Sequence, residues 1–367
     1  MTKTTEKSHR DPGLDLLRIL AMLLIILHHS VDHSGVLECA PEAGVAGYCY
    51  IRFVYMLTQV CVNIYVLLSG YFLVRSHFKL QKLAALWMET VFYSLTIKLI
   101  FMLTGKTPFS AVSLASCVFP IVTGRYWFIT IYLGLYMLSP FLNTAIRAMD
   151  RRQHLALNLV LMLLFSAWNS IHPSIAGMNS GGGWGLAWFV VLYLTAAWFR
   201  LYYEPGNKRG PWWLFWVGAA LITMLLYCFA GRRLPIVKAA TGNWYRYDSL
   251  PAYLSSLALL VCFLSVEIKN ARLCRWISFL APSTLGVYLI HAHANLSPYL
   301  WEQLDLPRLV GRAYFPGIQL FVVLGIFLLC SGADILRRLT LGRLETSAFV
   351  KSSCDWAENR LKALFRV

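Results

Sequence analysis

Long apolar blocks recur along the whole chain, and they constrain its fold more than any other feature. Hydrophobic residues make up 58% of the sequence and charged residues 14%, whereas soluble domains are about one quarter charged. A helix needs about 20 mostly apolar residues to cross a bilayer, and its backbone hydrogen bonds must close within it. We therefore predict an all-α membrane helix bundle with about ten transmembrane helices. They are expected near residues 14–33, 52–73, 85–104, 125–145, 155–170, 184–203, 212–231, 250–267, 276–296 and 316–336.

Two segments could each change the predicted number of transmembrane helices by one. The block at 155–170 is short for a membrane span. The segment at 108–122 is apolar enough to be an interfacial or re-entrant helix. Counts of nine and eleven therefore stay open.

The basic residues of the loops alternate between the two sides of the predicted membrane. With ten helices, 22 of the 33 Lys and Arg residues fall on the side of the two termini and nine on the other side. Because short cytoplasmic loops are enriched in Lys and Arg, both termini are predicted to be cytoplasmic. The chain then divides into a cytoplasmic N-terminus at 1–13, a transmembrane domain at 14–336 and a basic cytoplasmic tail at 337–367.

The net charge of +16 is spread over many small loops. Orientation in the membrane and contact with anionic lipid headgroups account for this charge, so we expect membrane lipids and no nucleic acid as partners. The nine cysteines show no metal-binding spacing, and we predict no metal site. Cys39 and Cys49 both fall in the first predicted outward loop, where a disulfide between them is an open alternative to two free thiols.

The first predicted helix carries the densest set of ionisable residues, which mark functional sites within membranes by default. Eleven positions separate Arg18 from His29, so both side chains point to about the same helix face, about 16 Å apart. Asp15 lies three positions before Arg18, close enough to pair with it. Asp32 lies three positions after His29 and is expected to orient its imidazole. Snorkelling of Arg18 and an interfacial place for His29 are the structural alternatives, but their common face favours function.

A small-residue pair ends the second predicted helix, and a basic stretch follows it on the cytoplasmic side. The positive-inside rule alone explains the basic residues. The functional alternative is an anchor for a phosphorylated cytoplasmic donor, because Lys and Arg are natural phosphate partners. The residues concerned are Ser69, Tyr71, Arg75, Lys79 and Lys82.

Aromatic and histidine residues towards the predicted outer side form a further candidate site. Trp127 begins the fourth helix, and Tyr288 and His291 lie in the ninth. The outward loop 232–249 contains Trp244 and Arg246, and aromatic faces beside hydrogen-bonding groups suit a sugar. Ordinary interfacial composition explains the aromatic residues equally well.

These residues together resemble the acyltransferase 3 family of membrane acyltransferases, in the branch that O-acetylates surface polysaccharides. The family pattern has Arg and His in the first helix separated by ten residues, then Ser-Gly-Tyr at the end of the second helix. It continues with a basic pair, a Tyr-Trp-Phe segment and a Leu-Gly-Val-Tyr-Leu-Ile-His stretch. The matching positions are Arg18 and His29, 69–71, Lys79 and Lys82, 126–128, and 285–291.

Two positions depart from the family pattern. Lys79 and Lys82 replace the usual arginines and lack the bidentate fork of Arg, which weakens the transfer of a donor-binding role to them. Asn63 and Tyr65 stand where an apolar residue or Pro is usual before the second-helix aromatic.

The resemblance implies transfer of an acyl group from cytoplasmic acyl-CoA, usually acetyl-CoA, to a hydroxyl of a glycan or lipid-linked sugar on the outer side. It also implies a multi-pass protein of the bacterial cytoplasmic membrane. We assign His29, Arg18 and Asp32 as catalytic residues, with His29 as general base. The donor site comprises Arg75, Lys79, Lys82, Ser69 and Tyr71, and the acceptor site Trp127, Tyr288, His291, Trp244 and Arg246.

Two other functions remain compatible with the residues alone. A transporter or flippase for a lipid-linked sugar would also place charges inside a ten-helix bundle. Transporters often contain paired repeats, however, and no two halves of this chain match. An inactive relative that serves as a membrane scaffold is the third alternative, which the intact motifs disfavour.

Overall fold

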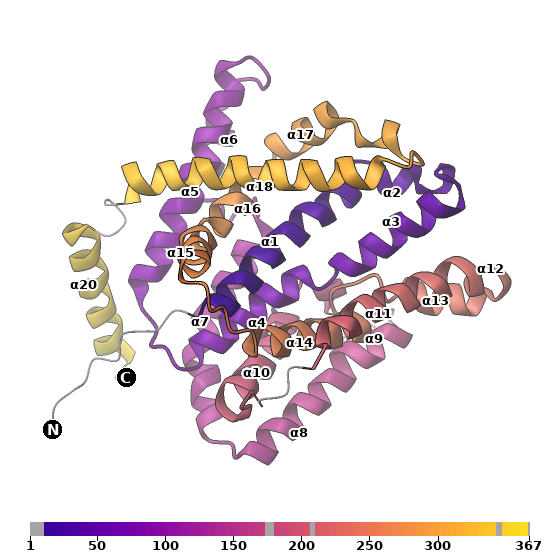
Figure 1. Ribbon diagram of the computed structural model, residues 1–367. Helices are drawn as coiled ribbons and strands as arrows, with labels where there is room; N and C mark the ends of the chain where they lie inside the picture. Colours follow the sequence, from indigo (N-terminus) through magenta and orange to yellow (C-terminus); the bar gives the residue numbers. More distant parts are fainter. Residues whose placement is uncertain (1–10, 173–179, 206–209, 343–346, 366–367) are drawn as a thin grey trace.

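The computed structural model describes residues 11–172, 180–205, 210–342 and 347–365. Within these residues the chain is all-α and forms one bundle (Figure 1). The predicted N-terminus at 1–13 lies mostly outside the described residues. Nine cysteines are described and all are free, so Cys39 and Cys49 do not form the disulfide that the sequence left open.

The ten predicted hydrophobic segments all coincide with helices. Eight are long and apolar enough to cross a membrane, and the remaining two are shorter apolar helices. The long segments are α1 (Pro12–Asp32), α3 (Gly44–Thr58) with α4 (Cys61–Leu73), α5 (Leu80–Leu103), α7 (Trp127–Arg147), α8 (Arg151–Met162) with α9 (Trp168–Ile171), α11 (Trp212–Leu225) with α12 (Gly231–Arg233), α15 (Ala271–Leu280) with α16 (Thr284–His291), and α18 (Phe315–Thr340). The shorter ones are α10 (Leu186–Tyr202) and α14 (Leu250–Leu264).

The two uncertain segments of the sequence are now defined. Residues 151–171 form a continuous helical segment of 21 residues, in which five π-helical residues join α8 to α9, so this segment is long enough for a span. The segment at 108–122 contains only α6 (Ala111–Val118), whose eight residues are too few to cross a bilayer. The remaining helices are α2 (Val36–Cys39), α13 (Pro235–Gly242), α17 (Leu296–Leu304) and α20 (Ala348–Phe365).

α1 lies at the centre of the bundle and packs against α3, α4, α14, α15, α16 and α18. Its start is sharply defined, because Asp11 accepts hydrogen bonds from the backbone N–H groups of Gly13 and Leu14 and Pro12 opens the helix. The beginning of α1 and α20 lie at one end of the molecule, whereas α2, α12 and α13 lie at the other (Figure 1). This arrangement agrees with the prediction that both termini share one side of the membrane.

Two glycines of the motifs allow close helix packing. A side chain at Gly70 would come within 2.9 Å of the backbone of Tyr193, so α4 and α10 approach closely only with glycine there. A side chain at Gly286 in α16 would overlap Asp334 of α18. The outward side of α18 carries exposed Phe321, Leu329 and Leu339, as expected for a face towards lipid.

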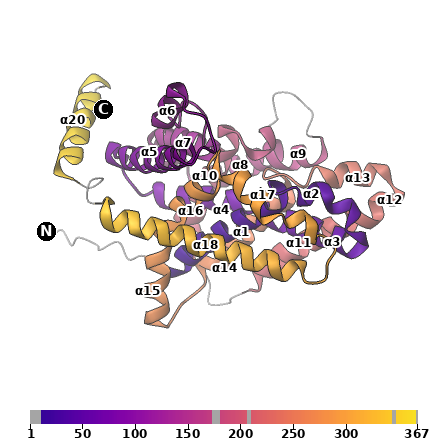
Figure 2. The ribbon, with the colours of Figure 1, turned by 90° about the horizontal axis from the view of Figure 1, so that it is seen from above.

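The ninth predicted segment is not one straight helix. α15 and α16 are separated by a short 3-10 turn at Ala281–Ser283, and Figure 2 shows α15 projecting away from the bundle. Pro282 in this turn explains the break, because proline cannot donate the next helical hydrogen bond. α18 in turn extends to Thr340, so Arg337 and Arg338 belong to this helix, which continues past the predicted boundary at residue 336.

Candidate functional site

A cavity of about 580 Å³ follows one face of α1. The residues of α1 that line it recur at steps of three or four positions, which is the spacing of one helical face: Arg18, Met22, Ile25, His28 with His29, and Asp32, followed by the C-cap residue His33. The common face predicted for Arg18 and His29 is therefore confirmed. Arg18 also forms the predicted ion pair with Asp15, with 3.6 Å between Nη1 and Oδ1.

His29 meets a histidine that lies 262 residues away in the sequence. Its Nδ1 atom is 3.1 Å from Nε2 of His291, and His291 Nδ1 is 2.6 Å from the carbonyl oxygen of Val287. Because a carbonyl can only accept, His291 Nδ1 carries a proton and, in the neutral ring, Nε2 is an acceptor. His29 then donates its Nδ1–H to His291. A neutral His29 consequently keeps its basic lone pair on Nε2.

Asp32 contacts Tyr55 and His33, and not His29, the partner predicted for it. It accepts a hydrogen bond from the hydroxyl of Tyr55 at 3.2 Å, and its Oδ2 lies 3.6 Å from Nε2 of His33. The ring of His33 in turn stacks on His29, with 4.1 Å between centroids. The direct contact predicted between Asp32 and His29 is thus wrong, because the Nδ1 side of His29 faces α16.

His28 is next to the catalytic candidate His29 in the sequence, but its ring contacts residues of α3. Its Nδ1 is 2.9 Å from the hydroxyl of Thr58, and its ring stacks on Tyr55 at 5.1 Å. The Thr58 hydroxyl itself donates to the carbonyl of Tyr55, so it accepts from His28. These contacts anchor the outer half of α1 to α3.

The walls opposite α1 combine basic, aromatic and small residues from other helices. Trp127 and Phe128 at the start of α7, Tyr65 and Ser69 of α4, Lys82 of α5 and Tyr288 of α16 all line the cavity. Trp127 packs on Trp184, with 4.4 Å between ring centroids. Together with Arg18 and His29 of α1, residues from all five sequence motifs line this cavity.

The sequence of the whole bundle was compared with known proteins. A family model described as an acyltransferase domain matches residues 11–337. The chain belongs to the acyltransferase 3 family. No curated protein and no solved structure gave a match. The resemblance of the motifs to the acyltransferase 3 family is thus confirmed, and the cavity lies within the acyltransferase domain.

The donor-site residues predicted for this acyltransferase separate into two groups. Lys82 and Ser69 line the cavity, whereas Tyr71, Arg75 and Lys79 are not among its lining residues. The Tyr71 hydroxyl instead accepts a hydrogen bond from Arg200 at 3.1 Å. Lys79 and Lys82 are both exposed at the start of α5, and Tyr136 of the cavity wall accepts a hydrogen bond from the Lys79 backbone N–H at 3.0 Å.

The unusual residues of α4 have structural roles in the acyltransferase domain. Asn63 donates to the carbonyl of Tyr247 at 2.8 Å and accepts from the indole N–H of Trp188 at 2.9 Å. The Tyr65 hydroxyl donates to the backbone carbonyl of Arg18 at 3.1 Å. Both departures from the family pattern thus supply polar links between the cavity wall and its neighbours.

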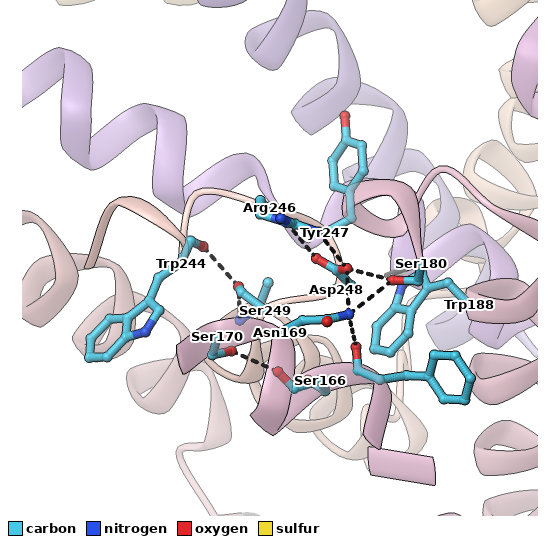
Figure 3. A network of polar contacts seen from close by, with 12 residues as sticks. Ser166, Asn169, Ser170, Ser180, Trp188, Trp244, Arg246, Tyr247, Asp248 and Ser249 are labelled. Carbon is cyan, nitrogen blue, oxygen red and sulfur yellow. Dashed lines mark hydrogen bonds and ion pairs between the residues drawn. The ribbon is translucent and has the colours of Figure 1, made fainter. Parts of the chain in front are cut away.

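A buried carboxylate organises the outer loops of the acyltransferase (Figure 3). Asp248 is fully buried, and both of its oxygens lie 3.0 Å from nitrogens of Arg246. The same carboxylate accepts hydrogen bonds from Ser180 at 2.5 Å and Asn169 at 3.1 Å. A buried charge is stable only when it is paired and hydrogen-bonded, and this network satisfies that condition.

The hydrogen-bond network of Asp248 determines which loop residues line the cavity. Trp184 and Tyr247 line it, and their rings pack together at 5.9 Å between centroids. The predicted acceptor residues Trp244 and Arg246 are not among the lining residues. Arg246 instead pairs with Asp248, and the Trp244 carbonyl accepts a hydrogen bond from Ser249. The outer loop therefore contributes Tyr247, which the sequence analysis did not select.

A second charge network escaped prediction because its members lie on different helices. Glu89 of the cavity wall forms an ion pair with Arg337 at 3.0 Å, and Arg337 also pairs with Asp334 at 3.0 Å. Asp334 further accepts from the Tyr93 hydroxyl at 2.8 Å. Glu89 falls within the third predicted helix at 85–104, whereas Arg337 falls within the predicted tail at 337–367.

Proposed function

We propose that this membrane acyltransferase moves an acetyl group from cytoplasmic acetyl-CoA to a hydroxyl of a cell-surface or lipid-linked glycan on the outer side. The observation that carries the proposal is a single cavity that contains Lys82, Arg18 and His29. A donor bound near Lys82 and an acceptor bound near His29 would share one space. A bacterial cytoplasmic membrane is the location that such a reaction favours.

At the cytoplasmic end, the phosphates of CoA meet Lys82, with Arg75 and Lys79 adding positive charge from outside the cavity. The pantetheine arm then extends along α1 towards His29. Arg18 lines the same cavity from α1. Its guanidinium is suited to stabilise the negative charge that develops on the thioester oxygen.

At the other end, Nε2 of His29 removes the proton of the acceptor hydroxyl. The hydroxyl oxygen attacks the thioester carbonyl, and the tetrahedral intermediate expels the CoA thiolate as its C–S bond breaks. The imidazolium of His29 returns its proton to the thiolate sulfur. His291 is a positioning residue in this scheme, because it accepts from Nδ1 of His29 and leaves Nε2 free to act as the base.

Asp32 has a different role in this proposal from the one expected from the sequence. It binds the Tyr55 hydroxyl and lies next to His33, so it fixes the outer end of α1 and supplies negative charge near the histidines. On the acceptor side, Trp127, Trp184, Tyr247 and Tyr288 present aromatic surface to a sugar.

The test uses membranes that contain the protein, radiolabelled acetyl-CoA and cell-envelope glycan. Wild-type membranes are expected to label the glycan, and His29→Ala should lower the rate by about 10²–10⁴. A matched control is His77→Ala, an exposed histidine outside the cavity. Full activity of His29→Ala would contradict its role as base. Movement of glycan across vesicles without label transfer would instead support the transporter alternative.

A further inference from the structure

A second pocket, of about 400 Å³, lies at the predicted outer end of the bundle. It is formed between the start of α3 and the segment that runs from the end of α11 to α13. Its lining residues are Pro41, Gly44, Val45, Tyr48, Tyr227, Cys228, Arg232 and Lys238. This pocket shares no lining residue with the cavity along α1.

Two cations, Arg232 and Lys238, line this pocket, and a third, Arg52, contacts the aromatic rings of its wall. The guanidinium of Arg52 lies 4.9 Å from the ring centroid of Tyr227 and 5.3 Å from that of Tyr48. The ammonium of Lys238 lies 5.8 Å from the same Tyr227 ring, and Arg232 lines the pocket. Cations near aromatic rings gain a modest attraction, which holds the side chains in place without neutralising their charge.

Among the described residues, no ion pair balances these charges. Glu42 is next to Pro41 in the sequence, but it is exposed and does not line the pocket. Arg52 adds a third positive charge beside the pocket, although it is not itself among the lining residues. Like charges repel one another, so two cations in one pocket with a third beside it favour a bound anion.

The surroundings indicate that the anion is attached to a lipid. Leu234 and Ile236 lie between Arg232 and Lys238 in the sequence, and both side chains are strongly exposed. Val45 on the opposite wall is exposed as well. Apolar side chains beside basic ones at the end of a membrane span match the boundary between lipid phosphates and acyl chains.

We propose that this pocket, which we call the outer anion pocket, binds the phosphate group of a membrane lipid. A phosphate offers several charged oxygens, which match Arg232 and Lys238 in the pocket wall, and Arg52 adds positive charge nearby. The lipid is either a bulk phospholipid or the lipid carrier of a glycan, because both present the same phosphate chemistry at this depth.

Aromatic contacts connect the outer anion pocket with the catalytic cavity. Arg52 lies 5.8 Å from the ring of Tyr245, and Tyr245 stacks on Tyr55 at 5.7 Å. Tyr55 donates its hydroxyl proton to Asp32, which lines the cavity. A phosphate in the pocket would thus lie beside the acceptor end of the cavity. The identification of this lipid as the carrier of the acceptor glycan rests on the proposed function.

The test measures lipid binding to the purified full-length protein in neutral detergent, by native mass spectrometry and without an acyl donor. Three probes are compared: a polyprenyl phosphate, phosphatidylglycerol, and a polyprenol that lacks the phosphate. The variant is Arg232→Gln combined with Lys238→Gln. Arg233→Gln is the matched control, because Arg233 is an exposed neighbour that does not line the pocket.

We expect the wild type to bind the phosphate-bearing probes, and the double variant to bind them about tenfold to thirtyfold more weakly. Arg233→Gln, and Arg232→Lys combined with Lys238→Arg, should bind like the wild type. Equal affinity for both phosphate probes would identify bulk phospholipid as the ligand, whereas a tenfold preference for polyprenyl phosphate would identify the glycan carrier.

Three results would contradict the proposal that the outer anion pocket binds a lipid phosphate. They are unchanged binding by the double variant, equal binding of the polyprenol without phosphate, and failure of the wild type to bind any phosphate probe. A melting curve of each variant checks that the fold is retained. Because no acyl donor is present, these outcomes are independent of whether the protein transfers acetyl groups.

Discussion

The two ends of the cavity along α1 are built differently. At the outer end, His29 is held between His291, 3.1 Å away, and the stacked ring of His33. At the predicted cytoplasmic end, Lys82 lies exposed at the start of α5. A proton acceptor must be oriented before the reaction, because its lone pair has to face the hydroxyl. A long flexible cation, in contrast, adjusts to a phosphate after the donor arrives.

This difference predicts that changes at the outer end affect the chemical step, whereas changes at the cytoplasmic end affect donor binding. Substitutions at both ends can therefore test the assignment through the split between kcat and KM.

The largest effect in this comparison is expected for His291→Phe, which keeps an aromatic ring but removes the acceptor for His29 Nδ1. The buried N–H of His29 then lacks a partner, and kcat should fall about tenfold to hundredfold. KM for acetyl-CoA should change little. The measurement is the acetyl transfer rate over a range of donor concentrations.

His291→Gln is the control for this substitution, because its side-chain amide keeps one donor and one acceptor. It should recover part of the lost kcat. Equal losses in His291→Phe and His291→Gln would show that the ring of His291, and not its hydrogen bond, is needed.

A smaller effect is expected for Lys82→Gln at the cytoplasmic end. Loss of one cation from a phosphate site should raise KM for acetyl-CoA about fivefold at low salt, with kcat unchanged. Lys79→Gln should have a smaller effect on this KM, because Lys79 is also exposed but adds its charge from outside the cavity. A lower kcat with unchanged KM in Lys82→Gln would contradict the assigned donor end.

The smallest effect is expected on the aromatic surface for the acceptor. Trp184→Ala removes a ring that lines the cavity and should raise KM for the glycan about threefold to tenfold. Trp244→Ala, in the same group of loops but outside the cavity wall, should leave this KM within about twofold of the wild type. Kinetics with varied glycan concentration separate the two variants, and equal effects would move the acceptor site towards Trp244.

The fold was predictable because its main signals are local in the sequence. Apolar blocks identified all ten helical segments, and residue spacing placed Arg18 and His29 on one face of α1. The limits of this approach appear where a helix breaks or continues. Pro282 divides the ninth segment, and α18 continues past residue 336 because Arg337 is paired inside the bundle.

The partners within the site were not predictable, because they come from distant parts of the chain. His291 was selected as a residue for the acceptor, yet it lies against His29 from α16. Asp248 explains why Arg246 stays out of the cavity, and only the folded loops bring these residues to Ser180. Helical periodicity defines a face, but it does not identify what packs on it.

The central claim is that the acyl group crosses the membrane through one cavity, from a cytoplasmic donor to an outer acceptor. The most direct measurement uses proteoliposomes of defined orientation, with labelled acetyl-CoA only on the cytoplasmic face and glycan only on the outer face. We predict label on the outer glycan for the wild type and a rate of labelling about 10²–10⁴ lower for His29→Ala. Label transfer that requires donor and acceptor on the same face would contradict the claim.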